Sequence, residues 1–197
     1  MLGTIWEVSN DDTGHYAKAI EAYQQALRIK PEDGDAWCDL GGAYDDSRQT
    51  AKAIEAFEQC VLVAPKQRPQ HWQRMGYHSW RRLGDLYRKS GQTAKAIEAY
   101  QQAVRMSAGN TLAHEPVDTL ALLGLGRAYN DAGEFSKAIE VLKQGLSIDP
   151  NSSPFWYDLG VAYSRSGQRD QVMEVYKRLK TVNPAWAEEC FKKVVAP

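Results

Sequence analysis

The chain has 197 residues, of which 43 % are hydrophobic and 25 % are charged, as in an ordinary globular protein. This composition excludes a largely disordered chain, and the formal net charge of −1 excludes a general preference for nucleic acid or anionic lipid. No stretch approaches the ~20 apolar residues of a membrane-spanning helix, and the N-terminus lacks the basic start and apolar run of a secretory signal. We therefore expect a soluble, cytoplasmic protein, with a cleaved signal or a trimmed chain as the alternative.

Two motifs recur in a constant order. The first, AKAIEAYQQALRIKP in its opening version, starts at Ala17, Ala51, Ala94 and Ser136, with a worn copy from Asp170. The second precedes four of these copies and reads WCDLGGAY, WRRLGDLY, LLGLGRAY and WYDLGVAY. Such self-similarity at a nearly fixed period is typical of a helical repeat protein.

The second motif has helical spacing, because Trp37, Leu40, Gly41 and Tyr44 follow i, i+3, i+4, i+7 and share one face. Together the motifs resemble the tetratricopeptide repeat, a 34-residue helix–turn–helix with W-x₂-L-G-x₂-Y, then A-x₃-F, then Pro. The resemblance covers about residues 14–184. It implies an all-α fold, an α-solenoid of antiparallel helix pairs wound into a right-handed superhelix with one concave and one convex side.

We expect a single array of repeats. In chain order it comprises a degenerate or partial repeat at 1–33, a repeat at 34–67, an insertion at 68–76, a repeat at 77–110, an insertion at 111–118, repeats at 119–152 and 153–184, and a capping helix at 185–197. The segment GTIWEVSNDD lacks L-G-x₂-Y, so a short degenerate helix with Trp6 and Val8, or a chain cut at this point, is expected there.

The boundaries of the repeats carry their own signals. Pro65 is expected to stop the second helix of its repeat, because proline lacks an N–H. Gly91, Gly133 and Gly167 occupy the turn between paired helices, where a positive φ is tolerated, and Arg48 replaces glycine there in the second repeat.

The repeat spacing is broken twice, by insertions of nine and eight residues between Trp37 and Trp80 and between Trp80 and Leu122. We expect the first to lengthen a helix by about two turns from Pro69, and the second to lengthen the next first helix from near Pro116. The two extensions would pack side by side as a lip. Its candidate residues are His71, Trp72, Met75 and His114.

The C-terminal segment reads as a capping helix that covers the last repeat with Ala187, Cys190, Phe191 and Val194.

The three cysteines, Cys38, Cys60 and Cys190, are odd in number, widely spaced and without C-x-x-C. We expect small buried apolar residues here, rather than a disulfide framework or a zinc site.

The family resemblance implies that the first helices line a concave groove that binds a peptide. The candidate groove residues are Arg81, Asp85, Arg88, Arg127, Asn130 and Tyr157. Arginine presents a planar fork to carboxylates, so an acidic or C-terminal peptide is the expected ligand. The alternative is that the basic residues of 68–95 pair with the acidic residues of 32–58, such as Asp39, Asp45 or Asp46.

No catalytic or metal-binding motif stands out, so we expect no enzyme activity, no cofactor and no metal. The predicted function is a protein–protein interaction scaffold that binds a protein or peptide. The alternative is a self-assembling element, or a part of a larger assembly, that forms homo-oligomers. Nucleic-acid binding is disfavoured, because the acidic residues of 32–58 adjoin the basic stretch.

Overall fold

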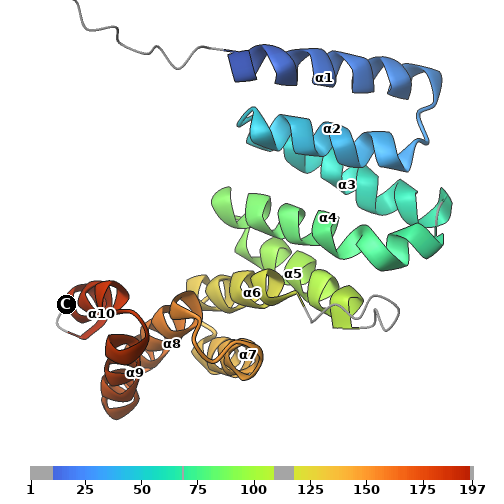
Figure 1. Cartoon of the computed structure of the whole chain (residues 1–197). Coiled ribbons are helices and arrows are strands. Elements are labelled where there is room, and N and C mark those ends of the chain that lie inside the picture. Colours follow the sequence, from blue (N-terminus) through green and yellow to red (C-terminus); the bar gives the residue numbers. More distant parts are fainter. Residues whose placement is uncertain (1–10, 68, 109–117, 196–197) are drawn as a thin grey trace, which may run out of the picture. The chain divides into compact units, whose positions relative to one another are not determined.

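The computed structural model describes residues 11–67, 69–108 and 118–195, and every regular element in these ranges is a helix (Figure 1). The helices are α1 (Asp11–Ile29), α2 (Gly34–Asp46), α3 (Thr50–Gln67), α4 (Pro69–Lys89), α5 (Thr93–Ala108), α6 (Thr119–Asp131), α7 (Phe135–Ile148), α8 (Ser153–Arg165), α9 (Arg169–Val182), α10 (Pro184–Cys190) and a π-helical turn (Phe191–Val195). The predicted all-α solenoid class is confirmed. The chain forms two compact units, residues 1–72 and 73–197.

In the first unit, α2 and α3 form a helix pair whose contact depends on one glycine. A Cβ atom on Gly41 would lie 2.9 Å from the ring of Phe57, closer than real Cβ contacts allow. The motif therefore needs glycine at this position, because only the bare backbone lets the aromatic ring of α3 approach. The expected stop at Pro65 is wrong: α3 continues through it to Gln67, since Pro65 falls in the last turn of the helix.

The turns between paired helices contain residues in the left-handed backbone conformation, as the glycines in the sequence predicted. Gly91, Gly133 and Gly167 have φ of 75°, 75° and 77°. Arg48 takes the same conformation with φ 61°, and it is the one non-glycine residue with positive φ among the described residues. A side chain in this region costs about 1–2 kcal/mol.

We expect Arg48→Gly to raise the free energy of unfolding by about 1 kcal/mol, the strain relieved less the greater entropy of a glycine in the unfolded chain. Gly91→Arg is the matched opposite, because a Cβ on Gly91 would meet nothing within 4 Å and the change is conformational only. Urea denaturation of both variants measures the effect. Two shifts of the same sign would contradict the argument.

The two cysteines of the first unit are joined, which corrects the expectation from the sequence. Cys38 on α2 and Cys60 on α3 form a disulfide, with Cα atoms 4.8 Å apart. The two residues are 22 apart in sequence, and only the antiparallel pairing of α2 and α3 brings them together. Cys190 is free and fully buried, as expected.

The lengthened helix is α4, which begins in the last residues of the first unit and lies mostly in the second. α4 has 21 residues, whereas the first helices α2, α6 and α8 have 13 each, so the predicted extension of about two turns is confirmed. The expected extension of the next first helix is wrong. α6 begins at Thr119, because the Asp118 carboxylate accepts hydrogen bonds from the backbone N–H groups of Leu120 and Ala121 and caps the helix there.

The C-terminal helix covers α8 and α9, as predicted. Ala187, Cys190 and Val194 are buried, and a Cβ atom on Gly160 of α8 would lie 3.5 Å from the Cys190 sulfur. Phe191 was assigned to the same inner face, but it is 41 % exposed and packs its ring beside Tyr176. Phe191 lies about 100° around the helix axis from Cys190, which places it at the edge of the stripe formed by Ala187, Cys190 and Val194 and leaves its ring partly exposed.

Candidate functional site

The candidate arginines of the second unit are bound by aspartates of the following first helix. Arg127 Nε of α6 lies 2.7 Å from Asp158 Oδ2 of α8. In the same way, Arg88 Nη1 of α4 lies 3.5 Å from Asp131 Oδ2 of α6. Each pair joins a first helix to the first helix of the next repeat, so together they form a ladder across α4, α6 and α8.

Arg81 extends this ladder at its start. Its Nε lies 3.3 Å from Asp118 Oδ2, and its Nη1 lies 3.5 Å from Asp85 Oδ2 on its own helix. Asp85 also accepts a 2.6 Å hydrogen bond from the Tyr100 hydroxyl of α5. Burial and the neighbouring Asp85 carboxylate raise the pKa of Tyr100, which keeps this hydroxyl a donor at neutral pH. Acidic partners for these arginines thus lie within the second unit itself.

Asp158 is almost as enclosed as Asp118, with a side chain 11 % exposed against 8 % for Asp118 and 36 % for its own partner Arg127. Burial raises the pKa of Asp158, and the Arg127 guanidinium works against that rise. Asn130 adds two hydrogen bonds between α6 and α8. Its Nδ2 donates to the backbone carbonyl of Asp158, and its own backbone carbonyl accepts from Arg165.

The structure separates the predicted groove residues into two groups. Asn130 is 4 % exposed and, together with Asp85 and Arg88, braces helices against one another. Arg127 and Tyr157, by contrast, line an open pocket of about 430 Å³. The other lining residues are Ala185, Trp186, Glu189 and Lys193, and we call this site the Tyr157 pocket.

The Tyr157 pocket has an aromatic corner and a charged rim. The rings of Tyr157 and Trp186 meet edge to face, with centroids 5.5 Å apart. Partial burial raises the pKa of Tyr157, so its hydroxyl stays neutral. Lys193 forms an ion pair with Glu189 one helical turn away. An apolar side chain packed on the rings would therefore have carboxylate-binding groups beside it.

The reading of the sequence missed Trp186, Glu189 and Lys193, because the C-terminal helix was interpreted only as a cap. A signal was present: Trp186 does not belong to the stripe of Ala187, Cys190 and Val194 that packs inward. Its ring meets Tyr157 instead, a contact that the spacing within the terminal helix does not specify.

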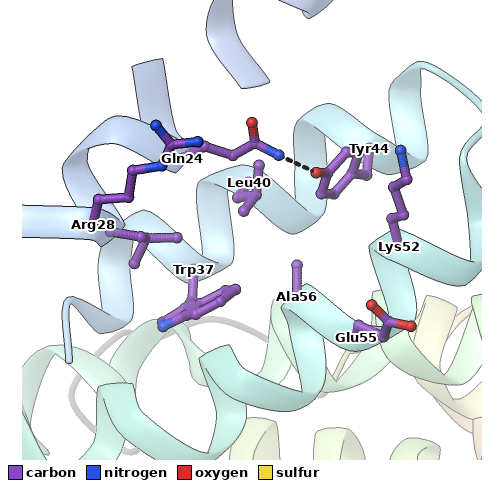
Figure 2. A pocket seen from close by; sticks show the side chains of 9 residues that line it. Gln24, Arg28, Trp37, Leu40, Tyr44, Lys52, Glu55 and Ala56 are labelled. Atoms are coloured by element: carbon purple, nitrogen blue, oxygen red, sulfur yellow. Dashed lines mark hydrogen bonds between the residues drawn. The ribbon is translucent and has the colours of Figure 1, made fainter. Parts of the chain in front are cut away.

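A second kind of pocket lies in the first unit, between α1, α2 and α3, with a volume of about 510 Å³ (Figure 2). Trp37, Leu40 and Tyr44 of α2 form its wall, and the Tyr44 hydroxyl accepts a 2.8 Å hydrogen bond from Gln24 Nε2. The Trp37 indole donates to the Pro31 carbonyl, which holds the ring in place.

This pocket recurs in the second unit. There, Trp156, Leu159 and Tyr163 form a wall between α7, α8 and α9, and the Trp156 indole donates to the Pro150 carbonyl. Each lining residue of α8 lies 119 positions after its counterpart in α2. The recurrence marks these pockets as a product of the repeat framework.

The residues proposed for a lip are only partly described. His71 is exposed and Trp72 is half-buried on α4. The side chain of Met75 and all of His114 lie outside the described residues, so the role of these four residues stays a prediction. A lip of two packed helical extensions is ruled out, because α6 begins at Thr119. Among the residues that the structure does describe, no group of three or more His, Cys, Asp or Glu is placed to hold a metal ion. Over the same residues, no helix has the length and apolar character to cross a membrane.

Helix pairs of this kind, each closed by a small residue in the first helix, define an α-solenoid of the class that serves as a protein–protein interaction scaffold. Models of the tetratricopeptide repeat match residues 12–46, 34–67, 81–153 and 129–189. The chain belongs to the tetratricopeptide repeat family. Proteins of this family and fold are typically non-catalytic scaffolds.

Solved structures of other repeat proteins share the fold. The MamA protein is 26 % identical with a TM-score of 0.73, over 91 % of this chain and 86 % of that one. YrrB, described as a TPR protein with an unusual peptide-binding site, is 19 % identical with a TM-score of 0.77, over 92 % and 86 %. The TPR-like repeats of a Podosopora anserina putative kinesin light chain are 23 % identical with a TM-score of 0.68, over 87 % and 89 %.

Among curated proteins, the peroxisomal targeting signal receptor of Kluyveromyces lactis is 24 % identical over 80 residues. The match takes in 41 % of this chain but 14 % of the receptor. The similarity is therefore one of repeats, and it extends over a small part of the larger protein.

Proposed function

We propose that the chain is a non-catalytic scaffold that binds a peptide segment of another protein in the Tyr157 pocket. The observation that carries the proposal is the Tyr157–Trp186 corner, where two aromatic rings meet at 5.5 Å beside an open volume of about 430 Å³. Aromatic residues at the centre of a contact supply most of the binding energy in protein interfaces. The corner suits one apolar or aromatic side chain of the partner.

The rim of the pocket favours a carboxylate next to that side chain. Lys193 is 63 % exposed in its side chain, and its ion pair with Glu189 is a surface pair worth about 0–1 kcal/mol, which a ligand carboxylate can displace. Arg127 keeps its Nε on Asp158, so the rest of its guanidinium faces the pocket from a fixed position. The proposed ligand therefore combines an apolar side chain with a nearby carboxylate. The carboxylate belongs either to an acidic residue within the segment or to the free C terminus of the partner.

The test is direct binding of fluorescein-labelled hexapeptides that end in Leu, Phe or Trp, with acidic residues before the end and a free or amidated C terminus. We expect Tyr157→Ala to weaken binding by about tenfold or more, because it removes one wall of the corner. Lys193→Glu should weaken the free-carboxylate peptides most. The matched control is Lys177→Glu, since Lys177 is equally exposed in a surface ion pair but lies outside the pocket.

Binding that Tyr157→Ala leaves unchanged, or no binding by any peptide of the panel, would contradict the proposal. A preference for free over amidated ends supports a C-terminal ligand, whereas equal binding of the two forms supports an internal acidic segment.

Two further expectations from the sequence stay predictions. Homo-oligomerisation is one, and sedimentation measures it. The cytoplasmic location is the other, and the Cys38–Cys60 bridge bears on it, because disulfides persist mainly in oxidising compartments. A bridge intact in protein isolated with its thiols blocked would favour such a compartment.

A further inference from the structure

The Tyr157 pocket is built by two separate parts of the second unit. Arg127 on α6 and Tyr157 on α8 belong to the repeats. The other lining residues lie on α10 and the π-helical turn after it, which together form the C-terminal helix: they are Ala185, Trp186, Glu189 and Lys193. Of the two rings of the aromatic corner, Tyr157 supplies one and Trp186 the other. The pocket is therefore complete only while the C-terminal helix lies on α8 and α9 (Figure 1).

The side chains that anchor the C-terminal helix are small. Its buried residues are Ala187, Cys190 and Val194. A hydrogen bond of 3.2 Å from the Ser164 hydroxyl of α8 to the Val194 carbonyl adds to them. By comparison, α8 buries the two large rings of Phe155 and Tyr163. An element with little buried apolar surface opens at a lower free energy than the core of the same protein, so the C-terminal helix is the part of this site that detaches most readily.

The start of the C-terminal helix depends on a cap. Asn183 Oδ1 accepts a 3.4 Å hydrogen bond from the backbone N–H of Trp186, and Pro184 occupies the first turn. Replacing such a cap by alanine typically weakens a helix by about fivefold in its equilibrium constant. Asn183 does not line the pocket, so a change at this residue acts on the docking of the helix and leaves the lining residues as they are.

Cys190 lies under the C-terminal helix and reports whether the helix is docked. Its side chain is fully buried, and burial raises the pKa of the thiol to about 11. The docked thiol is therefore both covered and protonated. When the helix leaves α8 and α9, the thiol meets solvent with an ordinary pKa of about 8.5 and becomes reactive. Cys38 and Cys60 are joined to each other, so Cys190 is the free thiol.

We propose that the C-terminal helix is a strap, which detaches from α8 and α9 while the repeats stay folded, and which a ligand of the Tyr157 pocket holds in place. The coupling to a ligand rests on the function proposed above, whereas the local detachment does not. A ligand that contacts both Tyr157 and Trp186 binds the docked state alone, because detachment removes four of the six lining residues. Binding therefore closes the strap, and detachment of the strap removes the binding site.

Alkylation of Cys190 by dilute iodoacetamide, followed by mass spectrometry, measures the detachment in the full chain. The thiolate displaces iodide and forms a sulfur–carbon bond, and at low reagent concentration this step is slower than redocking of the helix. A peptide of the panel above, added at about 100 times its Kd, should slow the alkylation about 100-fold, because the detached fraction falls by that factor.

Two variants test the detachment without any ligand. Asn183→Ala should speed the alkylation about fivefold, because it removes the cap of the C-terminal helix. Ser152→Ala is the matched control, since Ser152 is the N-cap residue of α8 but makes no side-chain cap hydrogen bond, and it should leave the rate unchanged. Below about 1 M urea the rate should rise little, because detachment of one short helix exposes little surface.

The outcomes separate the strap from the proposed function. An alkylation rate that rises with urea as steeply as global unfolding does, or that Asn183→Ala leaves unchanged, would overturn the strap. A peptide that binds without slowing the alkylation would overturn the coupling and leave the binding site standing. If no peptide of the panel binds, the proposed function fails together with the coupling, and the two variants and the urea dependence still decide whether the helix detaches locally.

Discussion

Loss of the Cys38–Cys60 bridge is expected to lower the free energy of unfolding of the first unit by about 3 kcal/mol. The bridge closes a loop of 22 residues, and a cross-link of that length restricts the unfolded chain by about this amount. The bridge joins α2 directly to α3, so its loss should be felt in this helix pair. Urea denaturation with and without a dithiol reductant measures the difference.

The matched variant is Cys38→Ala/Cys60→Ala, in which alanine at 60 is the residue that the third repeat has at the same place, Ala103. It should be destabilised to the same degree with or without reductant. Cys190→Ala controls for the third thiol, and it should keep the full response to reductant.

Thiol counting separates the bridge from three free cysteines. Burial raises the pKa of Cys190 to about 11, so this thiol is protonated and slow to react in the folded protein. Unreduced protein should show one thiol when denatured, and reduced protein should show three. Three thiols without reductant, in protein purified under air, would contradict the bridge.

Arg127→Leu is the second change with a large expected effect, a loss of about 1–3 kcal/mol in the free energy of unfolding. It leaves the Asp158 carboxylate, 11 % exposed, without the guanidinium that binds it at 2.7 Å. This expected loss of stability is smaller than the loss caused by breaking a fully buried ion pair, because Arg127 itself is 36 % exposed. Arg178→Leu is the control, since Arg178 makes an exposed hydrogen bond to Asn151 and should change stability little.

The double variant Arg127→Leu/Asp158→Leu should recover much of the loss, because replacing both partners of a buried pair with apolar residues removes the cost of burying the charge. A double variant less stable than Arg127→Leu alone would show that Asp158 is stabilising by itself, and would contradict this account.

The loss caused by Arg127→Leu should also depend on pH. Burial already raises the pKa of Asp158, and without Arg127 it should rise further. A carboxyl with a raised pKa in the folded state stabilises the fold when protonated, and that stability is lost as the pH rises through the folded pKa. The difference between Arg127→Leu and the unmodified chain should therefore be smaller near pH 4 than at pH 7. A difference that grows on acidification would contradict the assignment.

Much of the fold could be predicted from the sequence, because in a repeat protein the same spacing of residues gives the same contacts in each repeat. The Leu-Gly-x₂-Tyr spacing of Leu40, Gly41 and Tyr44 recurs in each later first helix, so the packed faces follow from the period alone. The lengthened α4 was predictable for the same reason, since helical spacing continues from Trp80 back through Gly76 and Trp72 to Pro69.

Only part of the candidate site could be predicted from the sequence. Arg127 and Tyr157 were found because they occupy groove positions of their repeats, and both line the Tyr157 pocket. Asp85, Arg88 and Asn130 occupy such positions too, but their partners are side chains of neighbouring helices. Which polar residues meet a ligand and which meet one another depends on contacts between repeats, which the position within one repeat does not specify.

By itself, then, the sequence determined the family, the all-α fold, the helix pairs and the long α4, because these depend on spacing along the chain. Only the tertiary structure decided that Cys38 meets Cys60, that Asp118 starts α6 after Pro116, and that Trp186 forms a pocket with Tyr157. Each of these depends on the distance or direction between side chains of different helices, or on a competition between two local signals. A repeat pattern specifies neither.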